Sequence, residues 1–544
     1  MAAKETPPAS RREWCLVAAI ALASLAVRLP VAIHCDIFQD EGLYWWEANE
    51  PGVNFCPQPP ATSLLVHAGQ ALLGEGSVLG LRLGSLLWGT ASIVLVFLLG
   101  RDPYGPATGL WAAALFAVTP LFLGIGSFIT PDALLVFLWL LFVWATWRAA
   151  AGASGWWWAA AGLVLAAGFY SKYTMALALP CALLALCAAP RGRALLRGPK
   201  PWLALALAAA AFAPVFLAWN AANGWASFRY HLSTRHVWTL SPANIAPYLA
   251  THAGAISPLI WAGVLAAFVA AWRSWRRGDW GSAWVLSFGL VPIAFFFVPS
   301  VFTKKALLRV HWDEMGYAIG LIGLAAAIAR LSQPGRPRGR WRRLGVAGIA
   351  AAALISGAAF VGSLRPGLAV ALRLRPPTRQ MLGWRDLARR VRSVRSGWRG
   401  AEPVIITDSA STHFCLAFHL RQRQNIYTLD SLVNRRYGLV EPLGVWGIDQ
   451  PHLVADMESG RLAPEAIFID QPHHTTRSTF PPPEQLTRLF ASVELLEPLL
   501  VTRGGRVVVI FTLYACRQWR ASSPDRGARS RRSDVAQPTT GDAQ

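Results

Sequence analysis

The chain has 544 residues, of which 54% are hydrophobic and only 15% are charged, and its formal net charge is +22. Water-soluble domains have about a quarter of their residues charged, so this composition excludes an ordinary soluble globular protein. The positive charge does not indicate nucleic-acid binding, because the basic residues cluster in links between apolar segments and lack the folded context that such binding uses.

Eleven apolar segments approach or reach the roughly 17–25 residues that a helix needs to cross a hydrocarbon core. They predict a polytopic α-helical membrane protein. The first segment is long enough to remain as an anchor rather than be removed as a signal peptide. The predicted spans lie near residues 14–33, 83–100, 107–124, 132–148, 156–170, 174–189, 201–219, 244–271, 281–299, 314–330 and 344–363.

The odd number of spans places the two ends of the chain on opposite sides of the membrane. Links on one side are basic, whereas the first loop on the other side, residues 34–82, collects acids. Because cytoplasmic loops are enriched in Lys and Arg, we expect residues 1–13 in the cytoplasm and the chain after the last span outside. The basic links lie at Arg101, Arg148, 191–200, 273–277 and 336–343.

The first external loop carries three acids within six residues, Asp36, Asp40 and Glu41. Carboxylates where a chain leaves a membrane are costly to desolvate and mark functional sites. The aromatic run from Tyr44 to Trp46 suits an interfacial helix, and the acids could instead cap that helix or solvate the loop. We favour the functional interpretation, because the acids are crowded beside the membrane.

The seven cysteines show no metal-type CxxC spacing. Cys35 and Cys56 bracket the first external loop, where a disulfide could persist. Two unpaired small residues are an equally good interpretation, so the pairing stays open.

Further polar groups are expected on the same side as Asp40. Thr130-Pro131-Asp132 indicates a helix start with an acid in the first turn, and it is explained either as a cap or as part of a site. Lys172 is a cation between two predicted spans. These residues place a second acid and a cation near the first loop.

Two further external loops are rich in cations or aromatic residues. Lys304 and Arg309 break the positive-inside pattern, which indicates either a bound phosphate or anchoring to anionic lipid headgroups. The loop 220–231 interleaves polar and aromatic residues, including Trp225 and Arg229. It suits either a bound sugar or an interfacial aromatic belt.

After Arg365 the pattern of the sequence changes. Short β-rich runs at 403–407, 466–470 and 506–512 alternate with helical stretches such as 384–394, which predicts an α/β domain with a parallel sheet. We assign this domain to residues 376–515 outside the membrane. Residues 516–544 lack periodicity and are expected to be disordered.

Glycosyl transfer from a lipid-linked phosphate needs this set of groups. A carboxylate takes the proton of the acceptor hydroxyl, and cations or a metal ion stabilise the charge that grows on the leaving phosphate. A single displacement inverts the anomeric centre. Such a reaction needs no soluble nucleotide-sugar site, and the sequence has no Gly-rich phosphate loop.

These motifs together resemble the C-type glycosyltransferases that use polyprenyl-phosphate sugars. They resemble in particular the bacterial branch of the dolichyl-phosphate-mannose protein mannosyltransferase superfamily (family 39), whose relatives include aminoarabinose and galacturonic acid transferases acting on lipid A. The resemblance covers residues 14–330 and extends more loosely through the C-terminal domain. Its motifs are Asp40-Glu41, Pro59-Pro60, Thr130-Pro131-Asp132, Tyr170-Ser171-Lys172-Tyr173, the segment from Trp219 to Arg229 and His311-Trp312.

The resemblance implies a role for each matching residue. Asp40 is the acid at the reaction centre, Glu41 is its neighbour, and Asp132 is a second acid near the acceptor or a metal ion. A divalent metal ion is the one cofactor that the resemblance leaves open. The residues expected to contact the donor phosphate are Lys172, Arg229, Lys304 and Arg309, and those expected to bind acceptor or sugar are Tyr44, Gln58, Trp225 and His311.

The sequence departs from the family pattern at two places. Gln58 stands before Pro59-Pro60 where relatives usually have His or Lys, which removes a cation or metal ligand. Asp313-Glu314 follow Trp312 where many relatives have Pro. They form either an extra acidic site or a new helix start.

The sequence therefore predicts an inverting transferase in the bacterial inner membrane, with a transmembrane domain over residues 14–365. Its partners are an undecaprenyl-phosphate-sugar donor, a lipid, glycan or protein hydroxyl acceptor and membrane lipids, and they do not include nucleic acid. A membrane transporter or lipid flippase is the alternative, and it predicts internal repeats and acids near span centres. A third possibility is an inactive sensor or scaffold.

Overall fold

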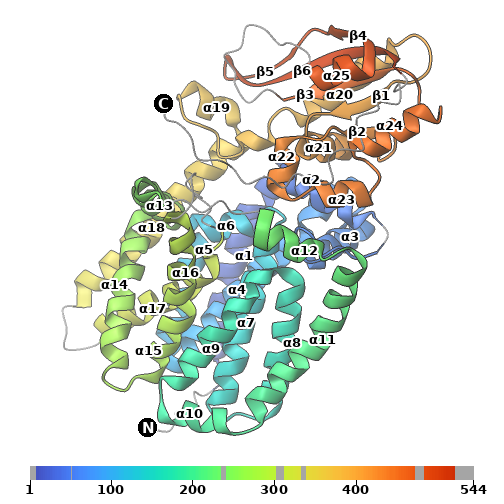
Figure 1. Cartoon of the computed structure of the whole chain (residues 1–544). Coiled ribbons are helices and arrows are strands. Elements are labelled where there is room, and N and C mark those ends of the chain that lie inside the picture. Colours follow the sequence, from blue (N-terminus) through green and yellow to red (C-terminus); the bar gives the residue numbers. More distant parts are fainter. Residues whose placement is uncertain are drawn as a thin grey trace.

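The computed structural model describes residues 8–50, 52–234, 240–301, 311–332, 338–471 and 483–520. The chain forms a bundle of long helices with a sheet-containing domain on one end (Figure 1). Lys304, Arg309 and residues 521–544 lie outside the described residues, so predictions about them stay predictions.

The helical part confirms the predicted polytopic membrane protein. Within the described residues, eight helical segments are long and apolar enough to cross a membrane, or nine if one bent pair counts as a single span. Its α-helices are α1 (Arg11–His34), α2 (Gln39–Ala48), α3 (Ala61–Leu73), α4 (Val78–Tyr104), α5 (Pro106–Val118), α6 (Pro120–Ile125), α7 (Pro131–Ala150), α8 (Trp156–Ser171), α9 (Ala178–Cys187), α10 (Pro190–Arg197), α11 (Lys200–Ala222), α12 (Ala226–Arg229), α13 (Ile245–Ile256), α14 (Pro258–Trp275), α15 (Trp280–Val285), α16 (Val291–Val301), α17 (Glu314–Leu331) and α18 (Arg338–Leu364).

Each of the eleven predicted spans is helical, but two are broken. The predicted span 244–271 divides into α13 and α14 at Ser257, whose φ is 80°. The predicted span 107–124 divides into α5 and α6 before Pro120, because proline cannot donate a helical hydrogen bond. Breaks of this kind are invisible to hydropathy, so the count of eleven is approximate.

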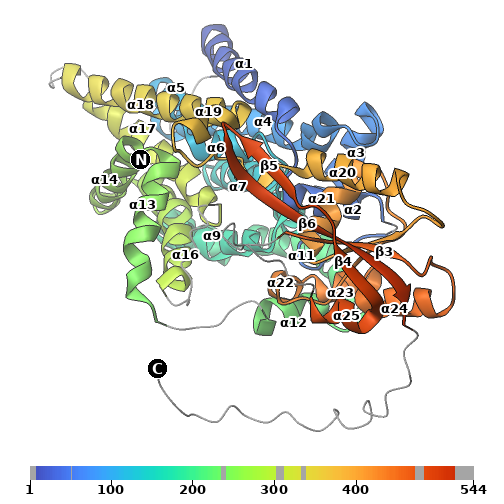
Figure 2. The ribbon, with the colours of Figure 1, turned by 90° about the horizontal axis from the view of Figure 1, so that it is seen from above.

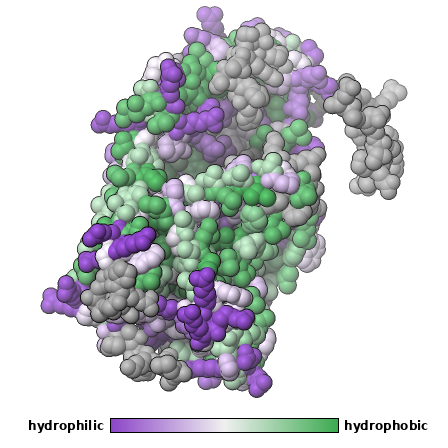
Figure 3. Space-filling model, turned by 90° about the vertical axis from the view of Figure 1, so that its left-hand side faces the viewer, coloured by the Kyte–Doolittle hydropathy of each residue, from purple (hydrophilic) through white to green (hydrophobic). Residues whose placement is uncertain are grey.

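The two ends of the helical part differ in charge and in what they carry. The beginning of α1 and helix α10 lie at the end opposite the sheet-containing domain (Figure 1). Hydrophobic residues cover the middle of the helical part, and hydrophilic residues gather toward its ends (Figure 3). Arg101, Arg148, Arg197, Arg273 and Arg330 each lie in the last turn of a helix.

The C-terminal domain holds a six-stranded mixed sheet in the order β2-β1-β3-β6-β4, with β5 paired to β6. Strands β2, β1 and β3 run parallel, as predicted, whereas β6 pairs antiparallel with β3, β4 and β5, so the predicted parallel sheet is correct for one half and wrong for the other. The strands are β1 (Val404–Thr407), β2 (Ile426–Thr428), β3 (Ala466–Asp470), β4 (Phe490–Leu495), β5 (Leu499–Arg503) and β6 (Arg506–Trp519). Because β6 continues to Trp519, the domain extends past the predicted boundary at 515.

Helices cover the sheet and connect it to the membrane part. Figure 2 shows α21 and α2 beneath the sheet when the molecule is seen from above. The helices of this part are α19 (Pro366–Ala371), α20 (Trp384–Ser396), α21 (Ala410–Leu420), α22 (Leu432–Tyr437), α23 (Val440–Val445), α24 (Gln450–Glu458) and α25 (Glu484–Leu489). The predicted helix 384–394 is thus α20.

Helix α2 of the first external loop packs directly against α21 of the C-terminal domain. The rings of Trp45 and Phe418 lie 5.4 Å apart, and those of Trp46 and Phe414 lie 5.8 Å apart. A Cβ atom at Gly42 would lie 3.0 Å from the backbone of Cys415, so glycine is what lets the two helices approach. The C-terminal domain therefore helps to position the loop that carries Asp40.

The two cysteines of this loop do not form a disulfide. Cys35 and Cys56 are both free and buried. The Cys35 thiol instead contacts the carbonyl of Ser363 at 3.7 Å. The interpretation as unpaired small residues is therefore the correct one.

Candidate active site

Asp40 lies in the first turn of α2 and is exposed, whereas the next residue, Glu41, is fully buried. Residues four and seven positions apart share a helix face, so Asp40 lies on the same face as Tyr44 and Glu47. Gly42 and Trp46 lie on the opposite face, against α21. The helix thus presents Asp40 away from α21, which packs against its opposite face.

Glu41 forms a buried ion pair with Arg82 at the start of α4. Arg82 Nε donates to Oε1 at 2.7 Å and Arg82 Nη2 donates to Oε2 at 2.6 Å, and both side chains are fully buried. The carboxylate also accepts the backbone N–H of Ile129 at 3.0 Å and that of Phe38 at 3.2 Å. With all of these bonds made, Glu41 fits a positioning role rather than the catalytic one that the sequence suggested.

Arg82 extends this network to the end of the first span. Its guanidinium donates to the carbonyls of Ala32, Cys35 and Asp36 at 2.8–2.9 Å. A buried ion pair is stable only when its remaining donors and acceptors are bonded, and here they are. The network therefore fixes the start of α2, which carries Asp40, against the segment that leads into α7.

Asp132 lies in the first turn of α7 and is 3% exposed. Lys172, which ends α8, donates to Asp132 Oδ1 at 2.5 Å and to the carbonyl of His311 at 3.2 Å. Because Glu41 binds the backbone of Ile129, only three residues before Asp132, the two predicted acidic segments are tied together. The structure thus brings Asp132, Lys172 and His311 into one cluster near α2.

Glu314 adds a second carboxylate beside Lys172. Its Oε1 lies 3.9 Å from Lys172 Nζ, the side chain is fully buried, and neither oxygen has a hydrogen-bond partner among the described residues. Asp313 caps α17 and accepts from the hydroxyl of Tyr248 at 2.7 Å. Both interpretations of Asp313-Glu314 therefore hold, since the pair starts a helix and also adds buried acids to the site.

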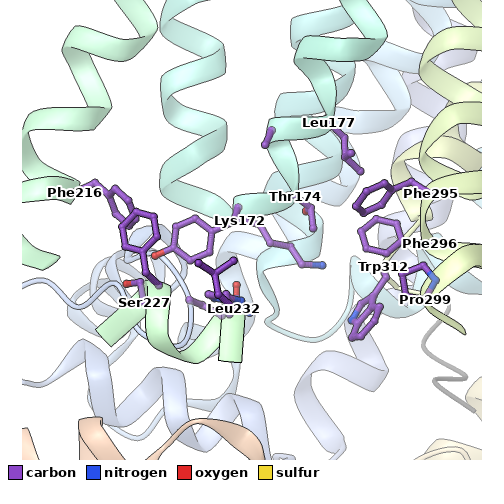
Figure 4. A pocket seen from close by; sticks show the side chains of 15 residues that line it. Lys172, Thr174, Leu177, Phe216, Ser227, Leu232, Phe295, Phe296, Pro299 and Trp312 are labelled. Atoms are coloured by element: carbon purple, nitrogen blue, oxygen red, sulfur yellow. The ribbon is translucent and has the colours of Figure 1, made fainter. Parts of the chain in front are cut away.

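Lys172 also lines an apolar cavity of about 520 Å³. In Figure 4 its side chain extends between Phe216 and Ser227 on one side and Phe295, Phe296 and Trp312 on the other. Gln58, His231 and Tyr173 complete the polar part of the lining. A long apolar volume with one buried cation suits a lipid chain that ends in an anion.

The wall of this cavity is held by hydrogen bonds to the segment before Pro59-Pro60. The Tyr173 hydroxyl donates to the carbonyl of Phe55 at 2.5 Å, and the Ser227 hydroxyl donates to the same carbonyl at 2.9 Å. His231 Nε2 lies 3.1 Å from the carbonyl of Pro57. These bonds therefore hold the segment that places Gln58 in the cavity lining.

The other residues predicted to contact phosphate or sugar do not lie together in the structure. Arg229 lines a second, polar cavity rather than the apolar one, so it is not grouped with Lys172. Trp225 is 48% exposed at the start of α12. Tyr44 is buried on α2. The predicted set of phosphate and sugar contacts therefore divides between two cavities and the surface.

Sequence reasoning missed Arg82 and the contribution of the C-terminal domain. Arg82 stood at the edge of the predicted span 83–100, and a lone arginine on the acidic side of the membrane was the available signal. His419 Nε2 lies 2.7 Å from Asp36 Oδ1, and Ser411 donates to Gln39 at 2.9 Å. Nothing in the sequence pairs residues so far apart.

The described residues include no group of three or more His, Cys, Asp or Glu side chains that could hold a metal ion. The carboxylate of Asp132 forms an ion pair with Lys172, and that of Glu41 forms one with Arg82. The described carboxylates therefore do not fit a metal site, and we derive no step through one.

Comparison with known proteins finds relatives of this chain in sequence and in structure. The family described as dolichyl-phosphate-mannose-protein mannosyltransferase matches residues 57–219, a range that includes Asp132 and Lys172 and begins after Asp40. The lipid A galacturonosyltransferase RgtD of Rhizobium johnstonii is 24% identical over 303 residues, which are 55% of this chain and 62% of that protein. The alignment thus spans less than two thirds of that relative.

Solved structures resemble nearly the whole chain. ArnT from Cupriavidus metallidurans, bound to undecaprenyl phosphate, has a TM-score of 0.59 at 16% identity and covers 93% of this chain and 98% of its own. The apo form has a TM-score of 0.60 at 14% identity, with coverages of 92% and 97%. The archaeal oligosaccharyltransferase AglB from Archaeoglobus fulgidus, in complex with an inhibitory peptide and a dolichol-phosphate, has a TM-score of 0.51 at 12% identity and covers 77% and 65%.

These findings confirm the predicted resemblance to the dolichyl-phosphate-mannose protein mannosyltransferase superfamily and the predicted fold class. That class is a polytopic C-type glycosyltransferase fold with a C-terminal α/β domain.

Proposed function

We propose that this chain, a multi-pass membrane protein with the C-type glycosyltransferase fold, transfers a sugar from a polyprenyl-phosphate donor to an acceptor hydroxyl. The observation that carries the proposal is the apolar cavity with Lys172 in its lining. A polyprenyl chain is apolar and its phosphate is anionic, which matches both properties of the cavity. The relatives point the same way, since an ArnT structure holds undecaprenyl phosphate and an AglB structure holds a dolichol-phosphate.

In this proposal Asp40 is the general base. Its carboxylate takes the proton of the acceptor hydroxyl as the hydroxyl oxygen bonds to the anomeric carbon. The bond from that carbon to the phosphate oxygen breaks in the same step, so the configuration inverts. The products are the glycosylated acceptor and the polyprenyl phosphate.

Lys172 balances the charge that develops on the leaving phosphate. Asp132 holds the ammonium group through the 2.5 Å contact and so sets its position before the donor binds. The network of Glu41 and Arg82 keeps the segments of Asp40 and Asp132 in register. Asp132 and Glu41 are therefore positioning residues in this mechanism.

The proposed location is the extracytoplasmic face of a bacterial inner membrane. Helix ends with basic last turns gather at the end that carries the start of α1, which supports a cytoplasmic N-terminus by the positive-inside rule. The site and the sheet-containing domain then face the outside. There the donor is supplied by an enzyme that charges the polyprenyl phosphate and by its translocation across the membrane.

The experiment uses the purified full chain in liposomes. Undecaprenyl phosphates that carry galacturonic acid, aminoarabinose or mannose are supplied with total envelope lipid as acceptor, and the released undecaprenyl phosphate is measured by mass spectrometry. We expect release with at least one donor, together with loss of one sugar from the envelope lipids and glycans of a deletion strain. Release from none of the donors, with an unchanged envelope, would contradict the proposal.

A further inference from the structure

A second cavity of about 570 Å³ adjoins the apolar one. Asn54 and Cys56 line the second cavity whereas Gln58 lines the first. In α12, Ala226 and Arg229 line the second cavity, and the residues between them face the first. The segment 54–58 and helix α12 therefore form a common wall between two cavities of different chemistry.

Three parts of the chain build this polar cavity. They are the end of α2 with the loop after it, the junction of α11 and α12, and helix α23 with the following Trp446 of the C-terminal domain, and Ser63 of α3 adds to them. The lining includes carboxylates, amides, one guanidinium and two half-buried indoles, namely Glu47, Glu50, Glu441, Asn54, Asn223, Arg229, Trp219 and Trp446. No such set lines the apolar cavity, whose polar groups are few.

The lining discriminates between ligand classes. An isoprenoid chain would leave the carboxylates and amides unpaired, which is costly. An anionic headgroup would find a single cation in the lining, Arg229, because Arg423 is not part of the lining and is paired with Glu50. A carbohydrate fits both features, because its C–H face can stack on an indole and its hydroxyls can donate to carboxylates and accept from amides.

The position of the polar cavity relative to Asp40 is also suitable. Glu47 lies seven residues after Asp40 on the same face of α2, which corresponds to about 10 Å along the helix. That distance is comparable to one or two sugar rings. A carbohydrate held at Glu47 and Trp446 can therefore present a hydroxyl toward Asp40.

We propose that the polar cavity is the acceptor site and that the group entering it is a carbohydrate, uncharged or amino-bearing, recognised in part by Trp446 and Glu441 of the C-terminal domain. This inference rests on the proposed function, because it names the acceptor class of the same reaction. It gives the C-terminal domain a direct part in specificity in addition to its support of α2.

Thiol protection in a catalytically disabled protein tests this directly. The background is the full chain with Cys15→Ser and Cys187→Ser, which remove the two exposed cysteines, and with Asp40→Asn. Val445→Cys places a thiol at the cavity on a residue that is 70% exposed, and Leu432→Cys on α22 is the matched control, at a residue that is 83% exposed and outside the cavity lining. The rate of maleimide labelling is measured with and without each probe.

The carbohydrate probes are maltohexaose, which is uncharged, and chitosan hexasaccharide, which bears amino groups, with a Ser/Thr-rich peptide and phosphatidylglycerol micelles for comparison. We expect at least one carbohydrate to slow labelling of Val445→Cys 5-fold or more and to leave Leu432→Cys unchanged. Adding Trp446→Ala or Glu441→Gln should abolish the protection, and Trp446→Phe should retain most of it. Protection by the peptide or the micelles alone, or by no probe, overturns the inference.

The two proposals can fail separately in this design. Protection by a carbohydrate in a protein whose wild type releases no undecaprenyl phosphate would contradict the proposed function and keep the carbohydrate site. Release of undecaprenyl phosphate by the wild type, without protection by any carbohydrate, would keep the proposed function and contradict the carbohydrate site.

Discussion

The two cavities on either side of segment 54–58 are similar in volume and opposite in character. One is apolar with Lys172 as its buried cation, and the other is polar with Glu47, Glu441 and Arg229. A transferase that takes a lipid-linked sugar and delivers it to a water-compatible group needs both environments next to each other. In the proposed function, the donor occupies the apolar cavity and the acceptor occupies the polar one.

Removal of the Asp40 carboxylate should have the largest effect on turnover. In the proposed mechanism this group takes part in the reaction itself, and it lines neither cavity. Asp40→Asn should lower the turnover of donor to undecaprenyl phosphate about 10²–10⁴-fold, the usual contribution of a general base. The thermal midpoint should be unchanged, since Asp40 is exposed. Glu75→Gln, at an exposed acid of the same external loop, is the control and should retain full turnover. An active Asp40→Asn enzyme would remove the catalytic assignment.

Replacement of the two cavity cations should separate donor from acceptor effects. Lys172→Gln should lower undecaprenyl phosphate release about 10²–10³-fold, as loss of one group that stabilises developing negative charge does, and should raise the KM for donor. Arg229→Gln should leave the donor KM unchanged and affect only transfer to acceptor.

Steady-state kinetics on variants whose folding has been checked by thermal unfolding would measure this difference. An equal rise in donor KM for Lys172→Gln and Arg229→Gln would mean that the two cavities are not functionally distinct.

The buried pair of Glu41 and Arg82 supports the frame that both cavities share. Glu41→Gln should destabilise the protein by about 3–5 kcal/mol, because it leaves the Arg82 charge buried and unpaired. The double variant Glu41→Gln with Arg82→Met should regain much of that loss. Glu13→Gln, which breaks the pair with Arg101 at the opposite end, should cost less than Glu41→Gln, because the Glu13 side chain is 17% exposed and water still reaches it.

Thermal unfolding in detergent would measure all three. If Glu41→Gln proved as mild as Glu13→Gln, the pair would not be the frame that the structure indicates.

Glu47 should give the smallest effect, a dependence of stability on pH that originates in the polar cavity. Burial raises the pKa of Glu47 from 4.5 to about 8, and the bond from Asn54 opposes this only in part. The folded protein then holds this proton more tightly than the unfolded chain. Protonated Glu47 therefore contributes fully to the free energy of unfolding below about pH 4.5, and this contribution is lost as the pH rises to about 8. Glu47→Gln should flatten this decline by about 2–4 °C in thermal midpoint. If the thermal midpoints of wild type and Glu47→Gln fell equally between pH 5 and 8, this prediction would be contradicted.

Much of the membrane part could be predicted from the sequence because hydropathy and charge report directly on spans and orientation. Asp132 and Lys172 were singled out as a helix start and an isolated cation, and the structure brings them to 2.5 Å. The break at Ser257 could not be predicted, since its positive φ leaves no hydrophobic signal. Local sequence patterns report on local conformation and say little about such interruptions.

The sequence did not predict which residues from distant segments contact each other. Glu41 was interpreted with its neighbour Asp40, but its role depends on Arg82, which is 41 residues away. The direction of β6 depends on the connection between β5 and β6. The predicted parallel pairing was therefore wrong for β6, which runs antiparallel to β3. Arg229 was grouped with Lys172 by the family resemblance, although its side chain on α12 lines the other cavity. In each case the decisive fact is a contact between distant segments.

A structure of the full chain with undecaprenyl phosphate tests the central claim most directly, namely that the apolar cavity takes the donor and the polar one does not. We predict density for the isoprenoid chain among Phe216, Phe295 and Phe296, with the phosphate in contact with Lys172 Nζ and no lipid in the polar cavity. A phosphate bound at Arg229 in the polar cavity, with the apolar cavity empty, would contradict the account.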